Sequence, residues 1–391
     1  MRKIKRVVFF LGTKFNQRDY HRFGFDIIQK RGYSVEAWNF TPWLRLDYAE
    51  NYSPPDLIDF TEHKIFNTFN EIKTAISTLQ NSDIVLDSFN IYSNYNLGDL
   101  NASEIGAMSC ALIPTIKINK HERYFSYLHL IIFKPFQTLY KIKKKIIKKI
   151  IKDRSLNFLI TSGKKSKNNK RHRIDKNTKI IKAHAYDYDR LLEEERNGNS
   201  TPFKLKDPFA VFLDEDIAFH PDYLHAGIKP YCTAERYYPE INEFFTEFEE
   251  KTDLKIIIAA HPRADYVARG NPFDAREIIF GRTISLVKES QIVLAHMSTS
   301  MNFAVLYRKP IILIDSKEYE SLLKTYIKAW RSALALTKIN ISEKWIINMN
   351  KINVNNKKYV QYKEHYIKEL GTPEKYVWDI FCDYLDGNQR T

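Results

Sequence analysis

Three short apolar runs follow one another in the C-terminal half of the chain. They cover residues 255–260, 291–296 and 310–314, and the shorter segment 277–280 lies between the first two. Continuous apolar runs of this length, without polar alternation, are typical of strands buried on both faces of a parallel sheet. The intervening segments, among them residues 301–307, follow a helical pattern. The pattern therefore predicts an α/β sheet of parallel strands in this half.

The N-terminal half repeats this rhythm. Apolar runs predict strands at 7–11, 34–40, 83–87, 113–118, 156–160 and 178–182, and helical spacing predicts helices at 23–30, 58–79 and 103–111. Residues 197–202 have the composition of a linker, and a length of 391 residues favours two domains. We predict a first domain at 1–200, a second at 201–345, and C-terminal helices at 346–391 that pack back on the first domain.

Two polar clusters directly follow apolar runs of the second domain. His261-Pro262-Arg263 ends the run 255–260, and Ser298-Thr299-Ser300 ends the run 291–296. Ligands of open parallel sheets bind beyond the carboxyl ends of the strands. Hydroxyl groups and free N–H groups at a helix start suit an anion there. Each cluster alone could simply end a strand or cap a helix, but the two together predict a phosphate site.

A third cluster, Asp214-Glu215-Asp216, follows the apolar run 208–213, and His220-Pro221-Asp222 comes shortly after it. In this order the motifs resemble those of bacterial sialyltransferases and capsule-type Kdo transferases, which are GT-B glycosyltransferases that use CMP-activated acidic sugars. The glycine that usually follows the acidic motif is replaced by Ile217. The resemblance implies an α/β GT-B fold, with two Rossmann-like domains and a cleft between them.

The resemblance also implies roles for individual residues. His261 and the hydroxyl cluster would bind the donor phosphate, and Asp214 would be the catalytic base. The residues themselves add Asp216 as a second base candidate, because grouped carboxylates raise one another's pKa. They also make His261 a catalytic candidate that could assist the phosphate as hydrogen-bond donor, cation or acid. The predicted nucleotide-binding residues are His261, Arg263, Arg276, Thr283, His296, Ser298, Thr299 and Ser300, and the predicted acceptor-binding residues are Asp19, His21 and His184.

No metal site is predicted, because the two Asp-x-Asp matches, at 187–189 and 214–216, are a common three-residue pattern. We therefore expect a metal-independent, inverting enzyme with no cofactor besides its nucleotide-sugar donor, and CMP is favoured over UDP. The expected reaction transfers a nonulosonic acid or Kdo to a lipopolysaccharide or capsule acceptor. Alternatives are a UDP-sugar transferase of the same pathway, a sugar-nucleotide epimerase, and a non-catalytic polysaccharide-assembly protein.

Charge adds a prediction about location. The chain has 61 Lys and Arg against 47 Asp and Glu, and residues 124–152 combine an apolar stripe with a lysine-rich face. Such a helix suits an anionic membrane surface, although a packed helix with a solvated basic face is the alternative. No nucleic-acid-binding signature is present.

Three scattered cysteines suit a reducing cytosol, and no apolar run reaches membrane-spanning length. We expect a cytoplasmic protein, peripheral at the inner face of the bacterial inner membrane.

Overall fold

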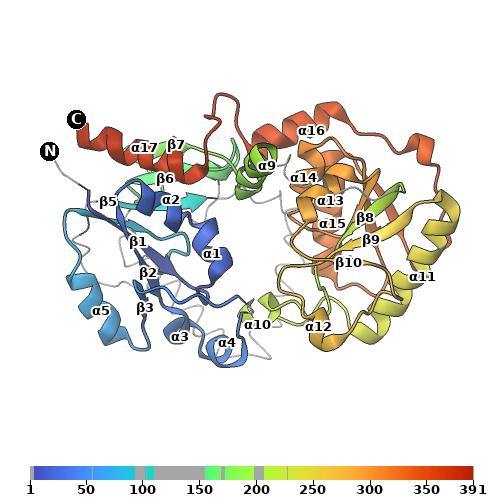
Figure 1. Ribbon diagram of the computed structural model, residues 1–391, viewed down its shortest axis with the longest axis horizontal. Coiled ribbons are helices and arrows are strands. Elements are labelled where there is room, and N and C mark those ends of the chain that lie inside the picture. Colours follow the sequence, from blue (N-terminus) through green and yellow to red (C-terminus); the bar gives the residue numbers. More distant parts are fainter. Residues whose placement is uncertain are drawn as a thin grey trace, which may run out of the picture.

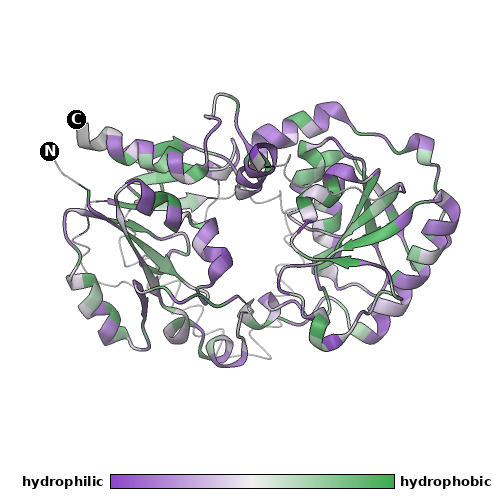
Figure 2. Cartoon of the chain, viewed as in Figure 1, coloured by the Kyte–Doolittle hydropathy of each residue, from purple (hydrophilic) through white to green (hydrophobic). Residues whose placement is uncertain are grey.

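The chain folds into two lobes that lie side by side, each built around one parallel sheet (Figure 1). The structure is a computed structural model. It describes residues 4–92 except 55, residue 102, and residues 104–109, 155–168, 172–197, 207–226 and 228–390. Within each lobe, apolar residues concentrate on the strands and the inner helix faces, and polar residues lie outside (Figure 2).

The first lobe holds a seven-stranded sheet with the order β3-β2-β1-β4-β5-β6-β7. All of its strand pairs are parallel. The strands are β1 Arg6–Leu11, β2 Ser34–Asn39, β3 His63–Ile65, β4 Asp83–Leu86, β5 Glu104–Ser109, β6 Phe158–Thr161 and β7 Lys179–Lys182. The helices between them are α1 Gln17–Arg22, α2 Phe25–Lys30, α3 Thr41–Leu44, α4 Leu46–Asn51 and α5 Phe69–Ser77, with a 3-10 turn at Ser166–Asn168.

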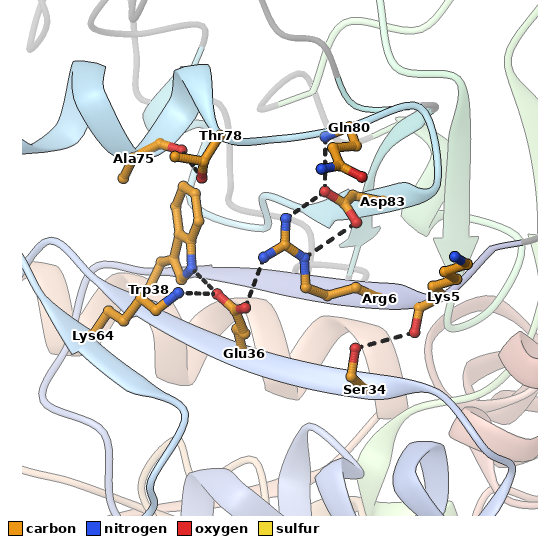
Figure 3. Close-up of polar contacts among 10 residues, drawn as sticks. All are labelled: Lys5, Arg6, Ser34, Glu36, Trp38, Lys64, Ala75, Thr78, Gln80 and Asp83. Carbon is orange, nitrogen blue, oxygen red and sulfur yellow. Dashed lines mark hydrogen bonds and ion pairs between the residues drawn. The ribbon is translucent and has the colours of Figure 1, made fainter.

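A charged network joins side chains of four strands, β1 to β4, in the first sheet (Figure 3). Arg6 in β1 donates to Glu36 in β2 at 2.7 Å and also pairs with Asp83 in β4. Glu36 further accepts from Lys64 at 2.8 Å and from the indole N–H of Trp38 at 2.7 Å. Each buried carboxylate here has both a cationic and an N–H partner. We therefore call the network closed, and we infer that it stabilises the sheet.

The second lobe holds a six-stranded parallel sheet with the order β10-β9-β8-β11-β12-β13. The strands are β8 Phe209–Leu213, β9 Lys255–Ala259, β10 Ile278–Ile279, β11 Ile292–Ala295, β12 Ile311–Asp315 and β13 Thr337–Asn340. The helices are α10 Asp222–Ala226, α11 Ala234–Thr252, α12 Tyr266–Arg269, α13 Thr283–Glu289, α14 Met301–Leu306, α15 Ser321–Leu334 and α16 Asn356–Tyr362, with a 3-10 turn at Met349–Lys351 and a π-helical turn at Lys363–Ile367. The α/β class with two Rossmann-like sheets is confirmed.

The chain crosses between the lobes twice. After β7, helix α9 (Tyr186–Asn197) contributes Tyr188, Leu191 and Leu192 to the core of the second lobe. After α16, the chain returns and α17 (Val377–Arg390) joins the core of the first lobe. By core membership the lobes therefore divide near residue 184, earlier than the predicted linker, and α17 belongs to the first lobe.

A glycine permits the close docking of α17. A Cβ atom on Gly24, which has φ of +59°, would lie 2.1 Å from the Trp378 side chain. The indole N–H of Trp378 donates to the carbonyl of Arg22 at 2.8 Å. Arg31 at the end of α2 reaches the acidic face of α17 and donates to Asp383 at 2.9 Å. The terminal helix is thus tied to the sequence that directly follows β1.

Two secondary-structure predictions are wrong. Residues 104–109 form β5 rather than a helix, because this segment pairs with β4 and β6 in the sheet interior. Gly106 makes room for the ring of Phe158, which a Cβ atom would meet at 2.1 Å. The predicted helix 58–79 is a short strand, β3, followed by α5. The predicted strand 113–118 and the basic segment 124–152 lie outside the described residues.

Candidate active site at the carboxyl ends of the strands

In the second lobe, β8 and β11 are the neighbouring strands at which the order of the sheet reverses. Ligands of open α/β sheets bind beyond the carboxyl ends at such a point. Strand β9 lies on the other side of β8. The three polar clusters of the sequence follow exactly these adjacent strands: Asp214–Asp216 follows β8, His261 follows β9, and Ser298 follows β11.

Asp214 is the structural centre of this region. One carboxylate oxygen accepts the backbone N–H of Asp216 at 2.9 Å, and the other accepts the N–H of His261 at 3.1 Å and the hydroxyl of Tyr266 at 2.7 Å. Burial raises the pKa of Asp214 to about 6 despite these donors. Its carboxylate thus holds the loop after β9 in place.

Asp216 is engaged in a different way. Its two oxygens pair with the guanidinium of Arg269 at 3.0 and 2.7 Å, in the bidentate geometry that favours a strong ion pair. The backbone of Asp216 has φ of +48°, a left-handed conformation that Asp and Asn tolerate best among residues with a side chain. The prediction that Asp214 or Asp216 is the base therefore meets a physical objection, because both oxygens of each carboxylate already accept hydrogen bonds from the protein.

Glu215 lies between these two aspartates in the sequence and was not among the predicted bases. Its side chain points toward the loop after β11. It accepts the backbone N–H of Met297, after β11, at 2.9 Å. Burial raises its pKa to about 8, so the carboxyl is mostly protonated at neutral pH. The acidic cluster therefore bridges both flanking loops: Asp214 holds the loop after β9, and Glu215 holds the loop after β11.

His261 lies against a second histidine, His220, with ring centroids 4.7 Å apart. Burial and the neighbouring cations lower the pKa of both rings, so both are neutral at pH 7. Nδ1 of His261 accepts the backbone N–H of Arg263 at 3.3 Å. A neutral ring that accepts at Nδ1 carries its proton at Nε2. His261 is thus a hydrogen-bond donor, rather than the cation or acid that the sequence left open.

Arg263 supplies the positive charge. Its guanidinium donates to Asp222 at 2.9 Å and approaches Nε2 of His220 at 3.3 Å. Tyr48, Tyr52 and Asp19 of the first lobe lie close enough to the Arg263 guanidinium for their charges to interact with it. Helices α4 and α10 are also in contact. We call this meeting of the two lobes the interlobe seam; it consists of Arg18, Asp19, Tyr48, Tyr52, His220, Asp222, His261 and Arg263.

The hydroxyl cluster lies two strands from His261, so the two strand ends are about 10 Å apart. Ser298 Oγ accepts the N–H of Ser300 at 3.2 Å, and the turn continues directly into α14. Thr299 is exposed, while Ser298 and Ser300 are partly buried. Thr283 begins α13 beyond the carboxyl end of β10, and it is partly buried. These residues therefore border the same edge of the sheet.

Two of the predicted nucleotide-binding residues, His296 and Arg276, do not lie at the carboxyl ends of the strands. His296 is fully buried in the core, where its ring nitrogens contact the Ile314 carbonyl and the Tyr237 hydroxyl. Arg276 pairs at 2.7 Å with Glu249, whose other oxygen accepts the N–H of Ile256 at the start of β9. It therefore lies at the amino end of the sheet, opposite the site. The prediction that these two bind nucleotide is wrong.

His184 does not bind an acceptor either. It is fully buried at the crossing between the lobes, and its Nε2 contacts the Lys375 carbonyl at 2.8 Å. Asp19 lies in the interlobe seam and is buried, whereas His21 is exposed on α1 and contacts Gln17 at 2.8 Å.

Among the described residues, no group of three or more His, Cys, Asp or Glu side chains is arranged to hold a metal ion.

No family model and no curated protein matches this chain. Solved structures do. A variant of the wall teichoic acid polymerase TagF, soaked with CDPG, aligns with a TM-score of 0.51 and 12% identity over 99% of this chain and 89% of that chain. The chain has the GT-B fold. MurG from Acinetobacter baumannii also aligns, with a TM-score of 0.44 and 8% identity, over 99% of this chain and 100% of that chain.

At these identities the likeness to GT-B glycosyltransferases concerns the fold. It agrees with the two parallel sheets, one in each lobe, that this chain contains. Within the part of the chain that the structure describes, no helix is both long and apolar enough to pass through a bilayer.

Proposed function

We propose that the protein is a glycosyltransferase that breaks the bond between a nucleotide phosphate and an activated sugar at the carboxyl ends of β8, β9 and β11. The observation that carries the proposal is the bridged arrangement of three loops. Asp214 fixes the loop that presents His261, and Glu215 fixes the loop that presents Ser298. Loops held by buried carboxyl groups provide the preorganised donors that such catalysis needs.

The departing phosphate gains negative charge as the bond to the sugar breaks. In the proposed complex, Nε2–H of His261 and the hydroxyls of residues 298–300 donate hydrogen bonds to the phosphate, and Arg263 adds positive charge. A neutral histidine donor is well suited to this task, because it retains its proton over the whole physiological pH range. Removal of one such donor from an electrostatic site typically costs about 10²–10³-fold in rate.

The favoured donor is a CMP-activated nonulosonic acid or Kdo, and the favoured acceptor is a lipopolysaccharide or capsule glycan. The sequence motifs support this donor class, and the TagF structure that aligns with this chain was soaked with CDPG, also a cytidine nucleotide by its name. UDP-sugars are the second donor class.

Nucleotide release tests the proposal. The purified protein is incubated with CMP-N-acetylneuraminic acid, CMP-Kdo, CDP-glycerol or a UDP-hexose, with and without core oligosaccharide prepared from lipopolysaccharide. Acceptor-dependent release of CMP that falls about 100-fold in His261→Ala supports the proposal. Conversion of a UDP-sugar without nucleotide release would instead identify an epimerase. No turnover of any donor, with nucleotide binding indifferent to His261→Ala, would identify a binding protein.

We also propose that residues 124–152 bring the enzyme to an anionic membrane surface, where a lipid-linked acceptor would lie. The lysine-rich face and the apolar stripe of this segment support the idea. Sedimentation with vesicles of phosphatidylglycerol, compared with vesicles of phosphatidylcholine alone, tests it. Binding to the anionic vesicles that is lost when the lysines are replaced by glutamine is expected, and equal sedimentation with both vesicle types would contradict it.

A further inference from the structure

Asp19 differs from the other carboxylates near the site. It lies in α1, and only 5% of its surface is exposed. Its backbone N–H donates to Asn16 Oδ1 at 2.9 Å, but within the described part of the chain its carboxylate accepts no hydrogen bond. The nearest cation is the guanidinium of Arg18, at 3.6 Å. A carboxylate that is nearly buried but not hydrogen-bonded is unusual, because burial normally requires partners for its oxygens.

Around Asp19, by contrast, lie buried hydrogen-bond donors that lack an acceptor. Nε of Arg18, the hydroxyl of Tyr52 and Nε of Arg263 are buried, and none of these atoms makes a hydrogen bond of good geometry with a described residue. The Arg263 guanidinium lies close enough to the Tyr52 oxygen to favour its ionised form, but the Tyr52 O–H itself remains available as a donor. All three can donate. Arg18 and Tyr52 belong to the first lobe, while Arg263 comes from the loop of the second lobe that also holds His261. Counted over the described residues, the interlobe seam therefore holds three buried donor groups that lack a hydrogen-bond acceptor and one carboxylate that accepts no hydrogen bond.

A hydroxyl-bearing ligand matches this set. One hydroxyl can donate its proton to the Asp19 carboxylate, and neighbouring oxygens of the same sugar can accept from the guanidinium and phenol groups. A simple anion would satisfy the donors but would be repelled by Asp19, and a simple cation would do the reverse. The seam thus fits a polyhydroxylated, uncharged part of a glycan better than either ion.

We propose that the interlobe seam binds the acceptor sugar and that Asp19 is the catalytic base. The inference rests on the proposed function. The acceptor hydroxyl oxygen attacks the anomeric carbon of the donor and forms the new C–O bond, while its proton passes to the Asp19 carboxylate. The bond between the anomeric carbon and the phosphate oxygen breaks, and its electron pair leaves with the nucleotide, next to His261.

The electrostatic surroundings suit this role. Burial raises the pKa of Asp19, and Asp56 raises it further, whereas Arg18, Arg22 and Arg263 favour the ionised form. The result is a raised pKa, which makes the carboxylate a stronger base than an exposed aspartate. The active form exists above that pKa, so kcat/KM should fall as the pH drops through it.

The test compares Asp19→Asn with Asp26→Asn. Asp26 is a matched control, because it lies on the neighbouring helix α2 of the same lobe and pairs there with the exposed Lys30. Because Asp19 accepts no hydrogen bond from any described residue, we expect its replacement by asparagine to leave the folded state intact. We expect CMP release with CMP-N-acetylneuraminic acid and core oligosaccharide to fall about 10²–10⁴-fold in Asp19→Asn and less than twofold in Asp26→Asn. CMP affinity, measured by calorimetry, should change less than twofold in both.

Two further measurements separate a base from a structural residue. The decrease of kcat/KM on the acidic side should disappear in Asp19→Asn, and Asp19→Glu should restore part of the rate. Tyr52→Phe should raise the acceptor KM several-fold with little change in kcat. An active wild-type enzyme with Asp19→Asn activity within fivefold of it would overturn the inference alone. A wild-type protein that releases no nucleotide from any donor would overturn the proposed function, and the inference with it.

Discussion

The carboxylates after β8 and the carboxylate in α1 differ in how their oxygens are used. Asp214 accepts three hydrogen bonds, and Asp216 forms a bidentate pair with Arg269. Asp19, on the facing lobe, accepts none within the described residues. All three are buried. Residue type and burial therefore do not distinguish a structural carboxylate from a candidate base, but the number of hydrogen bonds that it already accepts does.

The comparison extends to the charged network in Figure 3. There Arg6 forms ion pairs with both Glu36 and Asp83, and Lys64 forms a second ion pair with Glu36. In the interlobe seam, by contrast, Arg18 and Arg263 retain unpaired Nε groups among the described residues. A closed network stabilises the fold, whereas an open one has hydrogen-bonding capacity left for a ligand. Variants that close or open these networks can test the distinction.

The largest effect on stability is expected for Asp214→Ala. The substitution leaves the N–H groups of Asp216 and His261 and the hydroxyl of Tyr266 without their acceptor. We expect a loss of about 3–5 kcal/mol in the free energy of unfolding, measured by urea denaturation, because buried donors are left unpaired. A loss below 1 kcal/mol together with a complete loss of turnover would instead restore Asp214 as the base.

A smaller effect is expected for Asp216→Asn. Asparagine tolerates the left-handed backbone at this position, so the substitution removes the charge without adding strain. Loss of the ion pair with Arg269 should cost about 1–3 kcal/mol of stability, whereas turnover should stay within tenfold of the wild type. Loss of turnover by more than 100-fold at unchanged stability would contradict the structural role.

An effect of similar size but opposite sign is expected for Glu215→Gln. The folded pKa of Glu215 is about 8, above the unfolded value of about 4.3. The folded state therefore holds a proton that the unfolded state releases, and the wild type loses stability as the pH rises from about 4 to 8. Glutamine keeps the acceptor for Met297 and does not titrate. Its stability relative to the wild type should rise by about 1–3 kcal/mol between pH 5 and pH 9. A pH-independent difference would contradict this view.

The strands of the second lobe were predictable from the sequence because each is a continuous apolar run buried on both faces, as in residues 255–260. Strand β5 was not, since Gly106 and the small residues around it have no strong strand preference, and its pairing between β4 and β6 decides its conformation. The basic segment 124–152 stays a prediction.

The site shows a similar division. The placement of His261 and Ser298 at strand ends follows from where the apolar runs stop. The sequence does not predict that His296 lies in the core while Ser298 lies at the site. Residues near a strand end can face either way, and packing against Tyr237 decides the orientation of His296. The contrast between Asp19 and Asp214 depends on donors that are distant in sequence, such as Tyr266, and no local pattern reveals them.

A double-mutant cycle tests the central claim, that His261 and Ser298 contact one nucleotide phosphate although they follow different strands. CMP affinity is measured by calorimetry for the wild type, His261→Ala, Ser298→Ala and the double variant. The account predicts that each single substitution weakens binding and that the two are coupled by about 1 kcal/mol or more, because both donors contact the same phosphate. Effects that add within about 0.5 kcal/mol, or a single variant with unchanged affinity, would contradict it.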